Sequence, residues 1–269
     1  MTRWAMASKR GIRGLLFVGL VGLVMAEAAL AGEPAIVPST LRPTAGQPMS
    51  LELNLPKTDR GGEVTWANAN LGQFFVRTGE RQQSLLPLNV GPDEKRAPLQ
   101  LDSPGPAMLC VGVGPPEARG QSDSWQRTTH CTKIVLNVQP KEPNTSPPAA
   151  TAVGVTGKTG QKIEIQPLMD PSALKVGDDL AVRVHYEGSK VKDAKLTATI
   201  TPGDVRAAGE VVDPGRPTDA EGSTWFKISK TGTWIIRFEH EVKDENNPSG
   251  PPRRYVAELI FEVAKGAER

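Results

Sequence analysis

The side chains in this sequence that are best suited to nucleophilic or metal chemistry are two cysteines and three histidines. They are Cys110, Cys131, His130, His185 and His240. Thiolates and imidazoles bind zinc and softer transition metals, but a structural site usually takes four such ligands at close spacing. Only His130 and Cys131 are adjacent, and alternation places His185 on the polar face of one expected strand and His240 on the apolar face of another. We therefore predict no metal site, and His130, His185 and His240 are the candidate histidine ligands should a metal be bound.

The two cysteines are expected to form a disulfide bridge. They lie in the alternating segments AMLCVGVG (107–114) and HCTKIVLNV (130–138). In each segment the cysteine is on the face opposite the apolar residues, so two neighbouring antiparallel strands would bring both sulfurs to the same outer face. In an oxidising compartment such a pair tends to be bridged. We predict a Cys110–Cys131 disulfide, and the alternative is a pair of thiolate metal ligands together with His130.

Catalytic motifs are missing from the sequence. It contains neither G-x-S-x-G nor H-E-x-x-H, and no grouping of serine, histidine and an acid can be assigned. The stretch GVTGKTG (154–160) resembles the end of a phosphate-binding loop, but Ala152 stands where that loop needs its first glycine. We interpret 154–160 as a flexible joint. The sequence thus predicts a protein that is not an enzyme, with no catalytic residues and no resident cofactor.

The first 31 residues have the pattern of a signal peptide. A basic start with Arg3 and Arg13 is followed by the apolar run 15–25 and by Ala29-Leu30-Ala31, a small-residue cleavage site. The apolar run is shorter than the roughly 20 residues of a spanning helix, so membrane contact is expected only if this segment stays uncleaved. Cleavage changes the formal net charge from +2 to −1, which argues against a nucleic-acid partner. We predict a periplasmic or secreted protein.

Alternation with a period of two residues dominates the rest of the chain and predicts antiparallel β-structure. In the first half, MSLELNL (49–55) is the clearest example. Around 139–152 the pattern stops and Pro, Ser, Thr and Ala prevail, which is typical of a linker. The expected organisation is a signal peptide (1–31), an N-terminal β-sandwich domain (32–139), a linker (140–159) and a C-terminal domain (160–265).

The second half contains six expected strands with no helical interruption. They are 163–168, 178–188, 193–200, 224–228, 232–242 and 253–264. Such a run of short strands predicts an immunoglobulin-like sandwich. Trp234 begins the buried face of 232–242, whereas Trp225 and Phe226 alternate, so only one of that pair is expected in the core. The predicted fold class is all-β, with two antiparallel β-sandwich domains of which the second is immunoglobulin-like.

The second half also resembles a bacterial envelope family of unknown function, often labelled a nickel-uptake substrate-specific (NikM-like) periplasmic component. The resemblance covers about 160–264. It rests on the order and spacing of Ile165-Gln166-Pro167-Leu168, Asp170-Pro171, Gly177-Asp178, Tyr186-Glu187-Gly188, Thr218-Asp219-Ala220-Glu221-Gly222 and Gly232-Thr233-Trp234. It implies an exported protein of two β domains, with nickel or cobalt as a possible ion. Members often begin the mature chain with a histidine, which 32–35 does not contain.

These features predict an exported, non-catalytic envelope protein that acts as an accessory or binding module. Its partner would be another envelope protein, and the resemblance points to a transporter component and to nickel or cobalt uptake. The alternative is a structural or adhesive spacer of the cell envelope with no metal role.

Overall fold

The computed structural model describes most of the chain after the predicted signal peptide. The described residues are 36–54, 65–67, 69–86, 90–114, 128–142, 153–202, 209–244 and 249–265. The predicted signal peptide (1–31) lies outside them. Within the described ranges, no helix has both the length and the apolar character that crossing a membrane requires.

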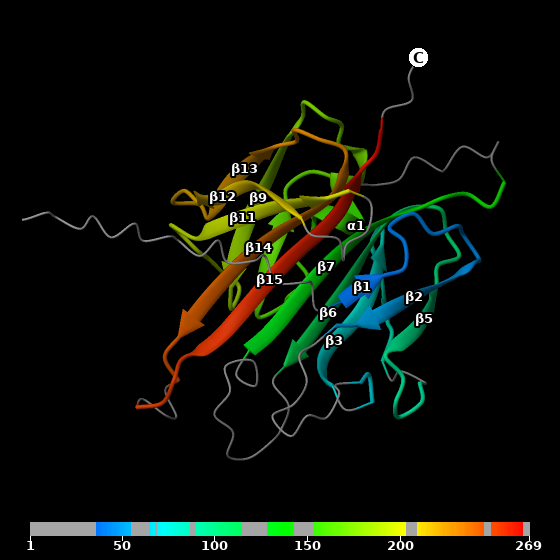
Figure 1. Cartoon of the computed structure of the whole chain (residues 1–269), viewed down its shortest axis with the longest axis horizontal. Coiled ribbons are helices and arrows are strands. Elements are labelled where there is room, and N and C mark those ends of the chain that lie inside the picture. Colours follow the sequence, from blue (N-terminus) through cyan, green and yellow to red (C-terminus); the bar gives the residue numbers. More distant parts are fainter. Residues whose placement is uncertain are drawn as a thin grey trace, which may run out of the picture. The chain divides into compact units, whose positions relative to one another are not determined.

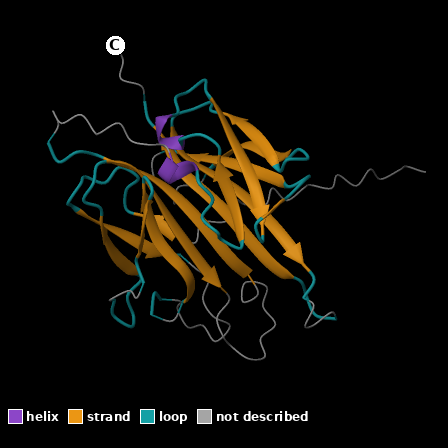
Figure 2. Ribbon diagram, turned by 180° about the vertical axis from the view of Figure 1, so that it is seen from behind, coloured by secondary structure: helices purple, strands orange, loops and turns teal. Residues whose placement is uncertain are grey.

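Nearly every regular element is a β-strand. The first half contains β1 (Ile36–Pro38), β2 (Pro48–Leu53), β3 (Asn70–Thr78), β4 (Arg81–Ser84), β5 (Arg96–Gln100), β6 (Gly105–Gly114) and β7 (Thr128–Val138). Helix is limited to two short turns in the described chain, α1 (Val153–Thr156) and the 3-10 turn η2 (Pro171–Ala173) (Figure 2). The second half contains β8 (Ile163–Pro167), β9 (Asp179–Tyr186), β10 (Ser189–Lys190), β11 (Lys195–Thr201), β12 (Glu210–Pro217), β13 (Ser223–Lys227), β14 (Gly232–Val242) and β15 (Arg253–Val263).

One sheet of eight strands contains strands from both halves of the sequence. Its order is β12-β11-β14-β15-β7-β6-β3-β4. The halves meet where β15 pairs with β7, side by side in Figure 1, and this pair is parallel whereas the other pairs in the sheet are antiparallel. The smaller sheets are β1-β2-β5 and a four-stranded sheet in which β9 pairs with β8, β10 and β13.

The two smaller sheets cover opposite faces of the large one. Successive residues of β6 belong to different cores: Met108 and Cys110 pack with the strands of the four-stranded sheet, whereas Leu109 and Val111 pack with β1, β2 and β5. Because successive side chains of a strand point to opposite faces, each face carries one sandwich core. The predicted all-β class, with antiparallel sheets packed as sandwiches, is confirmed.

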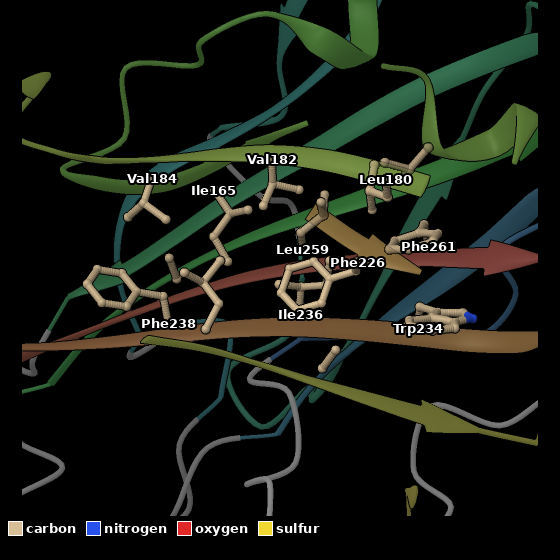
Figure 3. Packing of buried hydrophobic residues seen from close by; sticks show 14 of the residues in the cluster. Ile165, Leu180, Val182, Val184, Phe226, Trp234, Ile236, Phe238, Leu259 and Phe261 are labelled. Atoms are coloured by element: carbon tan, nitrogen blue, oxygen red, sulfur yellow. The ribbon is translucent and has the colours of Figure 1, made fainter. Parts of the chain in front are cut away.

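The core beneath the four-stranded sheet is rich in large apolar side chains. Figure 3 shows Leu180, Val182 and Phe226 of the small sheet facing Ile236 and Leu259 of the large one. Trp234 fills the same layer, with its ring stacked 6.2 Å from that of Phe261 and its indole nitrogen donating to the Lys230 carbonyl. The sequence-based expectation that Trp234 lies between two sheets agrees with this position.

The division into two domains stays a prediction, but the structure constrains how separate they are. Residues 31–269 form one compact unit. In the β15–β7 pair, Arg254 is the register partner of Thr128 and Ile260 of Ile134, so both predicted domains contribute to one hydrogen-bonded ladder.

The connecting segment, defined here as Val153–Gln161, is packed, so its interpretation as a flexible joint is wrong. Val155 is fully buried, and a Cβ on Gly154 would lie only 2.5 Å from the Gly79 nitrogen. Arg77 donates to the Lys158 carbonyl at 3.0 Å. Glycine here permits close approach of two backbones instead of motion, which composition alone does not distinguish.

Candidate functional site

The structure does not bring the three histidines together. His130 lies on β7, His185 on β9 and His240 on β14. The ring of His240 packs 4.7 Å from Tyr186 and 5.8 Å from Phe238, measured between centroids. Over the described ranges, no three His, Cys, Asp or Glu side chains are grouped so that they could hold one metal ion.

Burial lowers the pKa of all three imidazoles, and it does so most for His130, whose pKa falls to about 4. The guanidinium groups of Arg237 and Arg254 act in the same direction on His130, against the weaker opposing effect of Glu239. All three histidines are therefore neutral near pH 7.

The predicted disulfide does not form in the structure, where Cys110 and Cys131 are free and buried. Cys110 is the register partner of Lys133, and Cys131 is the partner of Gly112, so the two cysteines occupy diagonal positions instead of facing ones. Diagonal Cα atoms are about 7–8 Å apart, beyond the usual span of a disulfide. The expectation of an outer, exposed face was also wrong, because the connecting segment and β8 cover it.

Both thiols should be inert in the native protein. Burial raises the pKa of Cys110 to about 12 and that of Cys131 to about 11, so almost no reactive thiolate exists near neutral pH. We expect no labelling by iodoacetamide at pH 7.5 in buffer and two labels per chain in 6 M guanidinium, counted by mass spectrometry. A mass lower by two hydrogens with no labelling in guanidinium would instead establish the bridge.

A buried ion pair between Lys133 and Glu164 joins the two halves of the sequence. Their side chains are 1% and 2% exposed, and the Lys133 ammonium lies 2.8 Å from a Glu164 carboxylate oxygen. The same oxygen accepts from the backbone N–H and from the hydroxyl of Thr159, at 2.9 and 2.6 Å. Sequence reasoning missed this pair because Lys133 alternates with Cys131 on the face that was expected to be outside, whereas the structure buries that face with Cys131 and Val135 in a core.

A second buried carboxylate lies on the opposite face of the large sheet. Glu258 of β15 accepts from the Thr132 hydroxyl at 2.9 Å and pairs with Arg237 at 3.2 Å. It is 1% exposed. The hydrogen-bond partners of these charged groups come from neighbouring strands. Such an arrangement is typical of a structural network and differs from that of a nucleophile with its base.

The most conspicuous exposed feature is an apolar row on the outer face of the four-stranded sheet, consisting of Leu168, Ala181 and Trp225. Ala181 accepts a hydrogen bond from the Leu168 N–H and is the register partner of Trp225, so the three residues lie side by side across three strands. Trp225 is 50% exposed, although it is a large apolar residue. Met169 and Val176, also exposed, lie in the turns that follow β8 and precede β9.

The indole of Trp225 is held in place from one side. The guanidinium carbon of Arg216 lies 4.1 Å from its ring centroid, and Arg216 is paired with Asp213 at 3.0 Å. Cation–π stacking with an anchored arginine restricts the rotamers of the tryptophan. The row is thus a preorganised surface suited to binding, and the alternation of Trp225 with Phe226 was the sequence signal that could have identified it.

Comparison with known proteins identifies a family and no closer relative. No curated protein matches the chain. Among solved structures, the D0-D1 domain of intimin is 12% identical, with 85% of this chain and 97% of that chain covered and a TM-score of 0.22. Three N-terminal domains of the bacteriophage RB49 Highly Immunogenic Outer Capsid protein (Hoc) are 8% identical, with 86% of this chain and 70% of that chain covered and a TM-score of 0.21. The Clostridium thermocellum CbhA fibronectin(III)-like modules are 10% identical, with 87% of this chain and 98% of that chain covered and a TM-score of 0.20.

The family model is the stronger result, because it matches residues 46–242, well over half of the chain, and includes strands of both sandwich cores and the connecting segment. The chain belongs to the family described as a domain of unknown function, DUF4198.

Proposed function

We propose that this protein is an exported, non-catalytic binding module of the cell envelope, and that it docks a partner protein through the apolar row. One observation carries the proposal: Trp225 is half exposed on the outer face of the four-stranded sheet, in one row with Ala181 and with Leu168, which is itself 37% exposed. Exposed apolar groups that are contiguous mark interaction sites, and tryptophan is the residue most enriched among those that dominate binding energy.

The rigidity of the row supports a binding role. Its residues come from strands whose opposite faces are packed in a core, with Leu180, Val182 and Phe226 pointing inward. Arg216 already orders the indole, so association would cost little further side-chain entropy. The proposed export rests on the signal-peptide pattern of 1–31.

The test is site-specific photocrosslinking in the source cells. A photoreactive amino acid at position 225 is expected to capture one discrete protein, and the same residue at position 211 is the matched control. Val211 is 45% exposed but lies on β12, outside the row. Adding Leu168→Asp to the chain labelled at 225 should abolish capture with an unchanged circular dichroism spectrum. The same captured bands at both positions, or capture that survives Leu168→Asp, would contradict docking through the row.

A spacer role in the envelope is the second candidate. The observation that favours it is the continuous ladder of the eight-stranded sheet, which makes one unit of both halves and suits a rigid separator. A pull-down in which every bound protein is still captured after Leu168→Asp would favour the spacer function.

The role in nickel or cobalt uptake remains a proposal that rests on the resemblance alone. It predicts saturable binding of Ni²⁺ or Co²⁺ near micromolar concentration by the purified mature chain. Isothermal titration tests this prediction independently of the photocrosslinking.

A further inference from the structure

His185 is buried at the place where the connecting segment meets the four-stranded sheet. Its side chain is 2% exposed, and its Nε2 lies 2.9 Å from the Gln166 side-chain oxygen. The Gln166 amide nitrogen donates to the Thr156 carbonyl at 2.8 Å, which fixes the amide so that its oxygen faces the imidazole. Nε2 must therefore carry the proton and donate, and Nδ1 is the unprotonated nitrogen. Nδ1 is buried and has no hydrogen-bond partner within the described structure.

Cations surround this imidazole on several elements. Lys158 of the connecting segment, Lys133 of β7 and Arg183 of β9 oppose a positive charge on it, and Glu164 of β8 alone favours one. Lys190 of β10 is also its register partner, with the ammonium paired to Glu221. Glu164 is already bound to Lys133 and Thr159. A proton on Nδ1 would thus add a buried cation with no free carboxylate to receive it.

The connecting segment covers Cys110, and the residues that follow it cover Cys131. The Thr159 side chain lies against Cys110, and the backbone of Lys162 and Ile163 lies against Cys131. The segment is held by side-chain hydrogen bonds from several elements. Thr159 donates to Glu164, Gln166 donates to the Thr156 carbonyl, and the Lys158 ammonium donates to the Gly188 carbonyl at 3.0 Å. Arg77 and Gln73 of β3 donate to the carbonyls of Lys158 and Gly160, and Gln161 donates to the Val111 carbonyl. Two of these contacts involve residues next to His185: Gln166, which is hydrogen-bonded to it, and Glu164, which is its register partner on β8. Weakening them would uncover Cys110 without breaking the large sheet.

We propose that the connecting segment opens in response to acid: protonation of His185 releases residues 153–161 from the sheets and exposes Cys110, while the eight-stranded sheet stays intact. Burial and the neighbouring cations lower the pKa of His185 in the closed state, so the open state binds the proton more tightly. Opening is therefore favoured as the pH falls below the ordinary histidine pKa of about 6.5, by up to about tenfold per pH unit.

The experiment measures the reaction rate of the native thiols with 4,4′-dithiodipyridine, a reagent that works in acid, between pH 7.5 and 5. Rates are divided by those of the guanidinium-unfolded chain at the same pH. For the natural chain this ratio should rise between pH 7 and 5.5, by at most about eightfold. His185→Gln keeps an Nε2 donor and cannot titrate, so its ratio should stay flat. His240→Gln, which lies outside this contact, should behave as the natural chain does.

Two results would overturn the proposal: a rise in the His185→Gln chain equal to that of the natural chain, or a rise that coincides with loss of the near-ultraviolet circular dichroism signal. Should His185→Gln not fold, hydrogen exchange of the natural chain decides the question. Protection corrected for intrinsic rates should fall between pH 7 and 5.5 in a peptide spanning 153–161 and stay constant in peptides of β7 and β15. Unchanged protection at 153–161 would refute opening.

Discussion

Replacing Glu164 with glutamine is expected to lower the free energy of unfolding by about 3–5 kcal/mol, because it leaves the buried Lys133 ammonium without a counter-charge. Both side chains are almost fully buried, so water cannot compensate. Burial alone would raise the pKa of the Glu164 carboxyl, but the Lys133 charge and the two Thr159 donors outweigh it and hold that pKa below its ordinary value. The measurement is urea unfolding followed by circular dichroism, where the midpoint should fall with little change in slope.

The matched control is Glu187→Gln, which removes the same charge from an exposed ion pair. Glu187 pairs with Lys162 at 3.1 Å, with side chains 58% and 43% exposed. Exposed pairs contribute at most about 1 kcal/mol, so this substitution should change little. Equal effects of Glu164→Gln and Glu187→Gln would show that the Lys133–Glu164 pair is solvated in solution. A double substitution, Lys133→Met with Glu164→Leu, should destabilise less than Glu164→Gln, because no isolated charge remains.

The strands of the second half are predictable from the sequence because their signal is local. Expected strands at 232–242 and 253–264 correspond to β14 (Gly232–Val242) and β15 (Arg253–Val263). Alternation also indicates which residues face the core of the second half: Trp234, Ile236 and Phe238 of β14 are buried, whereas Glu239 and Glu241 on the opposite face are exposed. These properties depend only on neighbours in the chain.

The pairing of β7 with β15 is different, because no local pattern specifies a parallel contact between residues such as Thr132 and Glu258, 126 positions apart. A weaker signal did exist. The segment IVLNV (134–138) of β7 is apolar at all but one position, which is typical of a strand buried on both faces. Assigning one of those faces to solvent is what produced the wrong expectation of an exposed disulfide.

Candidate sites were harder to predict than strands, for the same reason. Lys133 and Glu164 come from opposite sides of the predicted linker (140–159), and Thr159 is its last residue. Their contact exists only once the connecting segment packs on β6 and β3. A lysine within an apolar strand indicates a buried charge, but the alternation of residues along the strand does not identify the carboxylate that pairs with it. The apolar row likewise depends on the lateral register of β8, β9 and β13.

Trp234→Ala is expected to lower the free energy of unfolding by about 3–5 kcal/mol, the range for removing a large aromatic side chain from a packed core. Trp234 is 1% exposed and packs between the four-stranded and the eight-stranded sheet, stacked on Phe261 (Figure 3). Its removal also ends the hydrogen bond to the Lys230 carbonyl. Urea unfolding monitored by circular dichroism measures the loss, and near-ultraviolet signals should weaken as the surrounding rings lose their fixed packing.

Trp225→Ala is the matched comparison, because it deletes the same side chain from the outer face of the opposite sheet. Half of that side chain is already in water, so its removal should cost at most about 1 kcal/mol, mainly through the lost stacking of Arg216. A large loss of stability from Trp225→Ala would mean that the indole is part of a core and would remove the basis for docking through the apolar row. A small loss from Trp234→Ala would contradict the face-to-face packing of the four-stranded sheet on the eight-stranded one. The two tryptophans, nine positions apart in the sequence, thus test separately how the fold is held together and which surface it offers to a partner.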